Sequence, residues 1–202
     1  YWWDAAPPED ARDHPLPETT DVAIVGSGYC GLTTAMELAR AGVGATVIEA
    51  GPLGFGASTR SGGMVSSGQK LVLTGAIETF GPALADQVFD ESKASYALVQ
   101  TLVEREGLDA DFQRCGRFFG AYAPSHYARL ERNAELLRRY TQVDVRMVPK
   151  QHQRTEIGSD HYYGGFVVTD YGGVHPAKYN RALRQAARRA GAGLHSHAAV
   201  KR

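Results

Sequence analysis

The chain has 202 residues, with 22 Lys or Arg against 22 Asp or Glu, so its formal net charge at pH 7 is zero. This balance gives no electrostatic reason to expect nucleic acid as a partner. Two cysteines are too few for a disulfide framework, which predicts a cytoplasmic protein, and no apolar run approaches the roughly 18 residues of a membrane span.

The chain begins with a segment, residues 1–20, that is rich in Pro and in acidic side chains. It has no charged region followed by an apolar one, so it does not have the pattern of a secretory signal. We expect an extended arm that leads to the first strand.

A strand–helix–strand unit follows the arm. Residues 22–25 are a short apolar run bounded by glycine, the pattern of a fully buried parallel strand. Residues 29–41 carry apolar side chains at helical spacing, and residues 45–48 are a second short apolar run. The apolar face of the helix is formed by Leu32, Ala35, Met36 and Ala39. Strand, helix and strand within about 30 residues predict one βαβ unit.

The rest of the chain predicts a long loop and then a mixture of helices and strands, giving an α/β fold. Glycine and serine dominate residues 51–68, which we expect to form a loop. The helix expected at 83–106 would bury Leu84, and Ser125 is expected to be the N-cap of the helix at 126–140. The expected helices span 83–106 and 126–140, and a third runs from 176 to a stop at Gly191. The expected strands lie in 112–123, on both sides of a turn in 162–176, and from about 194.

The βαβ unit carries a G-x-G-x-x-G motif at Gly26, Gly28 and Gly31, with Glu49 at the end of its second strand. Gly26 permits a tight turn, Gly28 lets the backbone approach a pyrophosphate, and Gly31 lets the helix pack closely on the strand. Phosphates bind favourably at the N-terminus of such a helix. Glu49 can accept hydrogen bonds from the hydroxyls of an adenosine ribose and would repel a 2′-phosphate, which disfavours NADP.

The motif alone does not separate NAD from FAD, because both cofactors carry the same ADP half. The alternative to either is a glycine-rich turn in an unrelated α/β protein, which the strand–helix–strand context argues against. Residues 54–63 favour FAD, because glycines and small polar side chains allow close approach of a cofactor longer than ADP. A surface loop without function is the alternative for this segment.

The sequence resembles the FAD-dependent amine oxidoreductases related to D-amino-acid oxidase, which include glycine oxidase, sarcosine oxidase and γ-glutamylputrescine oxidase. The likeness is carried by the glycine motif followed by "VIEAG", the loop "GFGASTRSGG", the opening "YWWDAAP" and the segment "GGVHPAKY". It extends through the whole chain in the family's order and is nearest to the γ-glutamylputrescine oxidase type. Thr59 and Ser61 stand where that type has Gly and Asn.

The resemblance implies roles for individual residues. Gly26, Gly28 and Gly31 would hold the pyrophosphate of FAD, and Glu49 would bind the adenosine ribose. The other implied cofactor contacts are Ser58, Thr59 and Arg60 at the pyrophosphate, ribityl or flavin groups, Gly62, Gly63 and Met64 near the isoalloxazine ring, and the backbone of a strand residue, Val200, at the adenine. No residue of the chain is singled out as catalytic.

The resemblance also implies a domain organisation. The arm of residues 1–20 would precede the first part of a FAD-binding domain at 21–107. Part of a β-rich substrate domain would occupy 108–172, and 173–202 would return to the FAD-binding domain. Family chains run to roughly twice this length, so we expect the chain to be an N-terminal portion of such a protein.

The implied reaction is oxidation of the C–N bond of a small-molecule amine or amino acid, with hydride transfer to the flavin and hydrolysis of the resulting imine. Two alternatives stay open: a flavin or NAD protein with another redox task, and a dinucleotide-binding module without catalysis. The sequence does not indicate an oligomeric state.

Four other features of the sequence are interpreted as structural rather than catalytic or metal-binding. Cys30 is interpreted as a variable position of the glycine motif, and His175 as a turn and cap residue. His195 and His197 are expected to face one side of the last strand, and without a third ligand they predict no metal site. The arginines expected on the solvated face of the last helix are Arg181, Arg184, Arg188 and Arg189.

Overall fold

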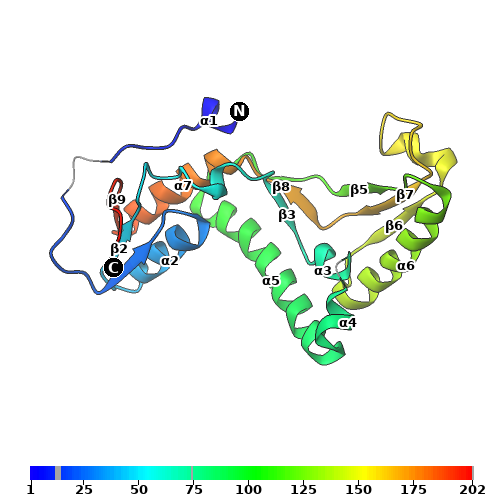
Figure 1. Cartoon of the computed structure of the whole chain (residues 1–202), viewed down its shortest axis with the longest axis horizontal. Helices are drawn as coiled ribbons and strands as arrows, with labels where there is room; N and C mark the ends of the chain where they lie inside the picture. The colour runs from blue at the N-terminus through cyan, green and yellow to red at the C-terminus, as the bar shows by residue number, and fades with distance from the viewer. Residues whose placement is uncertain (12–14, 74, 202) are drawn as a thin grey trace. The chain divides into compact units, whose positions relative to one another are not determined.

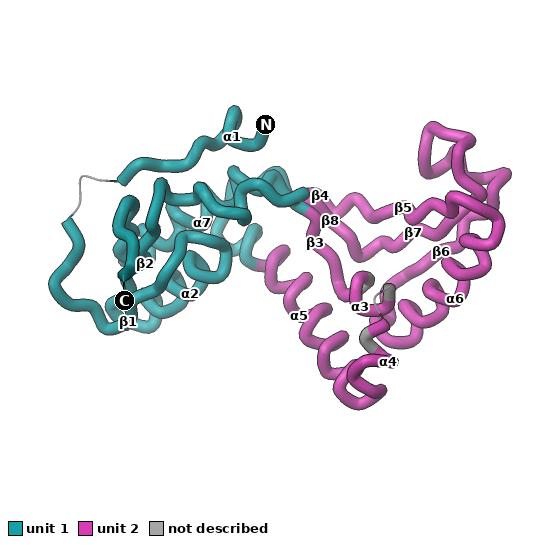
Figure 2. Tube along the Cα trace, in the orientation of Figure 1, with its two compact units in different colours: residues 1–63, 102–112, 174–202 teal, residues 64–101, 113–173 magenta. Residues whose placement is uncertain are grey.

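The computed structural model of the protein describes residues 1–11, 15–73 and 75–201 (Figure 1). The chain forms two compact units (Figure 2). Unit 1 comprises Tyr1–Gly63, Leu102–Phe112 and Val174–Arg202, and unit 2 comprises Met64–Thr101 and Gln113–Gly173. The mixture of helices and strands confirms the α/β class.

A parallel three-stranded sheet forms the centre of unit 1. Its strands are β1 (Val22–Val25), β2 (Ala45–Ile48) and β9 (Gly193–His195), in the order β1-β2-β9. Helix α2 (Tyr29–Arg40) connects β1 to β2 and packs against α7 (Pro176–Arg189), which precedes β9. The predicted βαβ unit is therefore confirmed, with both strands at the expected residues.

The burial of β1 differs from the prediction, and that of β2 shows why. Ala45, Thr46 and Val47 of β2 are buried because β2 lies between the other two strands. Strand β1 has one neighbour among the described strands, its side chains alternate between half-buried and exposed, and Val25 is 71% exposed. The expectation of a fully buried first strand is wrong for this chain.

The first residues are not extended throughout. They form a short helix, α1 (Trp2–Ala5), which packs on α7 (Figure 1). Glu9 then pairs with Leu53 through two backbone hydrogen bonds of 3.0 and 2.8 Å. Residues 12–14 of the predicted arm lie outside the described residues.

The glycine-rich segment of residues 51–68 contains more regular structure than predicted. It includes a 3₁₀ turn, η1 (Ala57–Thr59), and a short strand, β3 (Met64–Ser66). Two short helices follow, α3 (Gln69–Leu73) and α4 (Ala76–Phe80).

Unit 2 contains two antiparallel sheets of three strands. One has the order β3-β8-β4 and the other β5-β7-β6. The strands are β4 (Gln113–Arg114), β5 (Arg117–Gly120), β6 (Val145–Val148), β7 (Gly165–Val168) and β8 (Tyr171–Gly173). The predicted bend within residues 112–123 separates β4 from β5, and β6 was not predicted.

Helices α5 (Pro82–Glu106) and α6 (Pro124–Thr141) confirm the two helices predicted for this region. Pro124 occupies the first helical turn of α6 and Ala123 is its N-cap, so the prediction of Ser125 as the cap is wrong. A 3₁₀ segment, η2 (Lys150–Thr155), follows β6. No helix in the described part of the chain is long and apolar enough to cross a membrane.

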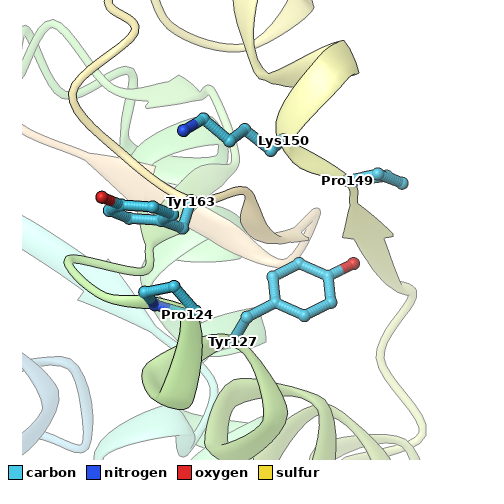
Figure 3. A pocket seen from close by; sticks show the side chains of 5 residues that line it. All are labelled: Pro124, Tyr127, Pro149, Lys150 and Tyr163. Carbon is cyan, nitrogen blue, oxygen red and sulfur yellow. The ribbon is translucent and has the colours of Figure 1, made fainter.

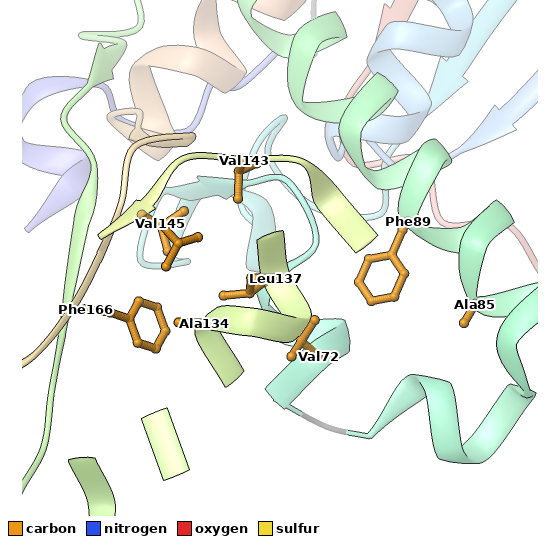
Figure 4. Packing of buried hydrophobic residues seen from close by; sticks show 9 residues of the cluster. Val72, Ala85, Phe89, Ala134, Leu137, Val143, Val145 and Phe166 are labelled. Atoms are coloured by element: carbon orange, nitrogen blue, oxygen red, sulfur yellow. The ribbon is translucent and has the colours of Figure 1, made fainter. Parts of the chain in front are cut away.

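The hydrophobic core of unit 2 lies between its helices and the β5-β7-β6 sheet (Figure 4). Phe89 of α5 stacks on Tyr140 of α6 with 5.2 Å between ring centroids. Leu84 is exposed, because Ala85 and Phe89 turn toward the core instead. The cluster consists of Val72, Ala85, Phe89, Ala134, Leu137, Val143, Val145, Phe166 and Val168.

Candidate cofactor site

The glycine motif forms a tight turn between β1 and α2. Gly26 has φ +97°, which favours glycine, and its N–H donates to the carbonyl of Ile48 at 2.9 Å. Gly28 is the N-cap of α2. A Cβ added to Gly31 would lie 2.2 Å from the carbonyl oxygen of Gly26. The helix therefore packs so closely on the turn that only glycine fits at position 31, as the motif predicts.

Glu49 follows β2 and faces the glycine turn. Its Oε2 accepts hydrogen bonds from the Ser27 N–H at 2.9 Å and the Ser27 hydroxyl at 2.8 Å, and Oε1 accepts from the Gly51 N–H at 3.3 Å. Burial raises the pKa of Glu49, but the hydrogen bonds from Ser27, Gly51 and Ala50 outweigh it and hold the pKa below its usual value. The carboxylate is therefore ionised and oriented at neutral pH.

Sequence reasoning missed Ser27, which lies between the first two glycines of the motif. Ser27 is buried, and its hydroxyl accepts from the Gly54 N–H at 2.9 Å while donating to Glu49. Its carbonyl accepts from Nδ2 of the buried Asn180, on α7, at 3.0 Å. These bonds join the glycine turn, Glu49, the start of the 54–63 loop and α7 in one polar network.

Ser58 lies over the N-terminus of α2. Its Oγ is 3.4 Å from the Tyr29 backbone nitrogen and would be 3.1 Å from a Cβ on Gly28. The Tyr29 hydroxyl lies 2.5 Å from the Ser58 carbonyl and 3.1 Å from that of Pro176. Burial raises the pKa of Tyr29 to about 12, so the phenol stays protonated and donates. Tyr29 thus fixes the loop against α2.

The side chains of Thr59 and Arg60 contact the first residues of the chain and the loop itself. Thr59 is buried, and its hydroxyl donates to the Gly54 carbonyl at 2.6 Å and accepts from the Trp3 indole N–H at 2.9 Å. The Arg60 guanidinium lies 5.7 Å from the ring centroid of Trp3 and 5.2 Å from that of Phe55. These contacts hold the loop itself.

The remaining predicted cofactor residues differ in exposure and in location. Gly62 is exposed, whereas Gly63 is buried with φ +69° and accepts from the Val174 N–H at 2.8 Å. Met64 opens β3 in unit 2. Val200 is 59% exposed and lies beyond β9, so the expectation that it belongs to a strand is wrong.

Two further predictions, which concern the last helix and the last strand, are wrong. The Arg184 side chain is 2% exposed and pairs with Glu9 at 2.8 Å, so it does not belong to a solvated face. His195 ends β9 and is buried, while His197 lies beyond it with φ +55°, so the two do not share a strand face. His175 is the N-cap of α7, as predicted, and its Nδ1 accepts from the Lys178 N–H at 3.2 Å. No metal-binding group of His, Cys, Asp or Glu occurs among the described residues.

A pocket of about 300 Å³ lies in unit 2 (Figure 3). Its walls are mainly apolar, and the Lys150 ammonium lies 4.2 Å from the centroid of the Tyr163 ring. The lining residues are Pro124, Tyr127, Pro149, Lys150 and Tyr163. None of the predicted cofactor residues contributes to it, so it is separate from the site around the glycine turn.

Comparison with known families and proteins agrees with this geometry. The family described as "FAD dependent oxidoreductase" matches residues 21–202. "Probable oxidoreductase OrdL" of Rhizobium meliloti is 32% identical over 201 residues, covering 96% of this chain and 46% of the relative. "Gamma-glutamylputrescine oxidoreductase" of Escherichia coli is 31% identical over 158 residues, covering 78% of this chain and 37% of the relative.

Solved structures show the same fold. Glycine oxidase from Geobacillus kaustophilus has a TM-score of 0.76 at 25% identity, covering 88% of this chain and 46% of the other. L-Amino acid deaminase from Proteus myxofaciens has a TM-score of 0.75 at 21% identity, covering 95% of this chain and 41% of the other. The chain thus spans less than half the length of the proteins it resembles.

Proposed function

The chain belongs to the FAD-dependent oxidoreductase family, and we propose that its activity is oxidation of the C–N bond of a small amine or amino acid. The observation that carries the proposal is the identity of 31% to gamma-glutamylputrescine oxidoreductase over 78% of the chain. The fold shared with glycine oxidase supports the same class of substrate. The resulting imine would be hydrolysed in water.

The geometry of the glycine turn fits the ADP half of FAD. A Cβ on Gly26 would meet no atom within 4 Å, so the turn is open on that side. The first N–H groups of α2 have no partner within the helix and are suited to a pyrophosphate. The oriented, ionised Glu49 is suited to the hydroxyls of a ribose.

We assign the 54–63 loop, called the flavin loop below, to the longer half of the cofactor. Ser58 lies beside the proposed pyrophosphate site, over the N-terminus of α2. Since the Thr59 hydroxyl is engaged within the loop, its contact with FAD would come from the backbone. The further proposed contacts are Arg60, Gly62, Gly63, Met64 and the backbone of Val200.

When bound, FAD supplies the ring system that accepts hydride from the substrate. The chain's own contribution is to bind and orient this cofactor. The predicted division into an arm (1–20), a FAD-binding domain (21–107 and 173–202) and part of a substrate domain (108–172) belongs to the same proposal. We assign the substrate to residues 113–172 of unit 2, which lie within the predicted substrate part and contain β4 to β7 of the antiparallel sheets.

The test is anaerobic reduction of the flavin in the complete protein. The visible flavin spectrum is recorded while amines and amino acids are added one at a time, with dithionite as the positive control. We expect at least one of them to bleach the flavin and to yield an aldehyde or a keto acid. Bleaching by alcohols or hydroxy acids alone would show another redox task, and bleaching by dithionite alone would indicate a non-catalytic flavin-binding module.

A further inference from the structure

We propose that residues 1–11, called the strap below, hold the flavin loop in the conformation that binds the cofactor, with Trp3 as the positioning residue and Glu9 as the anchor. The inference rests on the proposed role of the flavin loop, and it assigns a task to residues that precede the family match at residue 21. All of the contacts that carry it lie within unit 1.

The contact between Trp3 and Thr59 is the centre of the argument. Thr59 is buried in the middle of the flavin loop, and its single hydroxyl proton is directed to the Gly54 carbonyl at 2.6 Å. The oxygen of this hydroxyl then accepts the indole N–H of Trp3 at 2.9 Å. Trp3 therefore completes the hydrogen bonding of the residue that closes the loop on itself.

Three further contacts join the strap to other positions of the loop. The indole N–H of Trp2 donates to the Ser61 carbonyl at 3.0 Å. The rings of Trp3 and Phe55 lie 5.3 Å apart, and the Arg60 guanidinium lies within 6 Å of both centroids. Contacts from the strap thus reach the loop at four of its ten positions, 55, 59, 60 and 61.

The strap is anchored by Glu9. Its backbone pairs with Leu53, the residue before the loop, and its carboxylate binds Arg184 at 2.8 Å and Arg188 at 2.5 Å. Because Arg184 is almost fully buried, removal of the carboxylate would leave a buried guanidinium without its counter-charge. This ion pair ties the strap to α7.

Two backbone contacts complete the attachment. The Ala11 N–H donates to the Ser196 hydroxyl at 2.8 Å, and Arg181 donates to the Ala5 carbonyl at 3.3 Å. The strap is therefore fixed to unit 1 at both ends and near its middle, and Trp3 is held where it reaches the loop.

The loop needs such support because of its composition. Four of the ten residues from 54 to 63 are glycine, and Gly54 and Gly63 have positive φ. Glycines lose more conformational freedom on ordering than other residues. Contacts that order the loop before the cofactor arrives lower the cost of binding, so loss of the strap should appear mainly as faster release of FAD.

The experiment uses the complete protein with three substitutions. Trp3→Ala removes the ring and its N–H, Trp3→Phe keeps a ring without the N–H, and Asp4→Asn is an exposed control on the strap. FAD release is followed by the rise in flavin fluorescence after dilution. Trypsin cleavage after Arg60 reports on the loop, and thermal unfolding reports on global stability.

We expect Trp3→Ala to release FAD about tenfold faster and to be cleaved faster by trypsin after Arg60, as expected for loss of a partly buried hydrogen bond with its packing. Trp3→Phe should lie between Trp3→Ala and the unmodified protein, and Asp4→Asn should match the latter. If Trp3→Ala does not fold, Trp3→Phe alone decides. Unchanged release and cleavage, or a lower melting temperature with unchanged release, would overturn the proposal. Because no readout depends on turnover, absence of amine oxidation would count against the proposed function and not against the strap.

Discussion

Replacing Gly31 with alanine is the most direct test of the glycine turn. The new Cβ would lie 2.2 Å from the Gly26 carbonyl oxygen and 3.2 Å from Cγ2 of Ile24. A Cβ in ordinary van der Waals contact lies about 3.4 Å or more from other heavy atoms, so α2 must move by more than about 1 Å from the turn. The first obstacle is backbone, which cannot rotate away as a side chain can. Overpacking of this kind costs about 1–3 kcal/mol and occasionally more.

The matched control is Gly158→Ala, because Gly158 has no positive φ and its added Cβ would meet no atom within 4 Å. Both variants of the complete protein are unfolded in urea, and FAD is titrated into the apoproteins. We expect Gly31→Ala to be destabilised by about 3 kcal/mol and to bind FAD more weakly, because the N-terminus of α2 is displaced. The close packing inferred at position 31 is refuted if the two variants show equal stability and equal affinity.

Three further predictions concern the same unit. Glu49→Ala should weaken FAD binding by about 1.5–3 kcal/mol, the range of a charged hydrogen bond, and a titration indistinguishable from the unmodified protein would exclude Glu49 from the ribose site. Gly28→Val should abolish FAD binding while circular dichroism shows a folded protein; stoichiometric flavin in that variant would contradict the placement of the pyrophosphate. Burial raises the pKa of Glu9, but Arg188 and Arg184 outweigh it and lower the pKa. The unmodified protein should therefore exceed Glu9→Gln in free energy of unfolding by the largest amount at pH 7, and this difference should decrease as the pH falls below about 4. A difference that does not depend on pH would show that Glu9 is not ionised in the fold.

The βαβ unit could be predicted because its signals are local. Two apolar runs of four residues, a helix with apolar side chains at helical spacing and glycines at both ends of the helix placed β1, α2 and β2. The burial of β1 could not be predicted in this way, because it depends on which strands flank it in the sheet. Strand β6 carried a usable signal: Val143, Val145 and Met147 alternate with polar residues, the ordinary pattern of a strand.

The start of α6 shows a similar limit of prediction from sequence. Serine is a good N-cap in general, and Ser125 precedes an apolar periodic segment. Pro124, however, fits the first turn of a helix, where its missing N–H costs nothing. The helix therefore starts one residue before the serine, and the more restrictive residue decides the boundary.

The parts of the candidate site that the sequence did not predict depend on contacts between distant residues. Ser27 and Asn180 are 153 positions apart, and Glu9 and Arg184 are 175 apart. The spacing of arginines on α7 is that of a solvated helix face. Arg184 is nevertheless buried, and it forms an ion pair with Glu9 from the distant N-terminal segment. No local pattern in either segment contains this information.

The flavin loop illustrates why a motif does not describe a complete site. The family resemblance implies that Ser58, Thr59 and Arg60 form one cofactor-contacting segment, yet their side chains have different partners. Ser58 lies over α2, whereas Thr59 and Arg60 contact Trp3. A loop with this many glycines is positioned by its surroundings rather than by its own sequence. Substitutions in the strap should therefore change cofactor affinity even though the strap lies outside the family match, and substitution of Thr59 should resemble substitution of Trp3 more closely than that of Ser58.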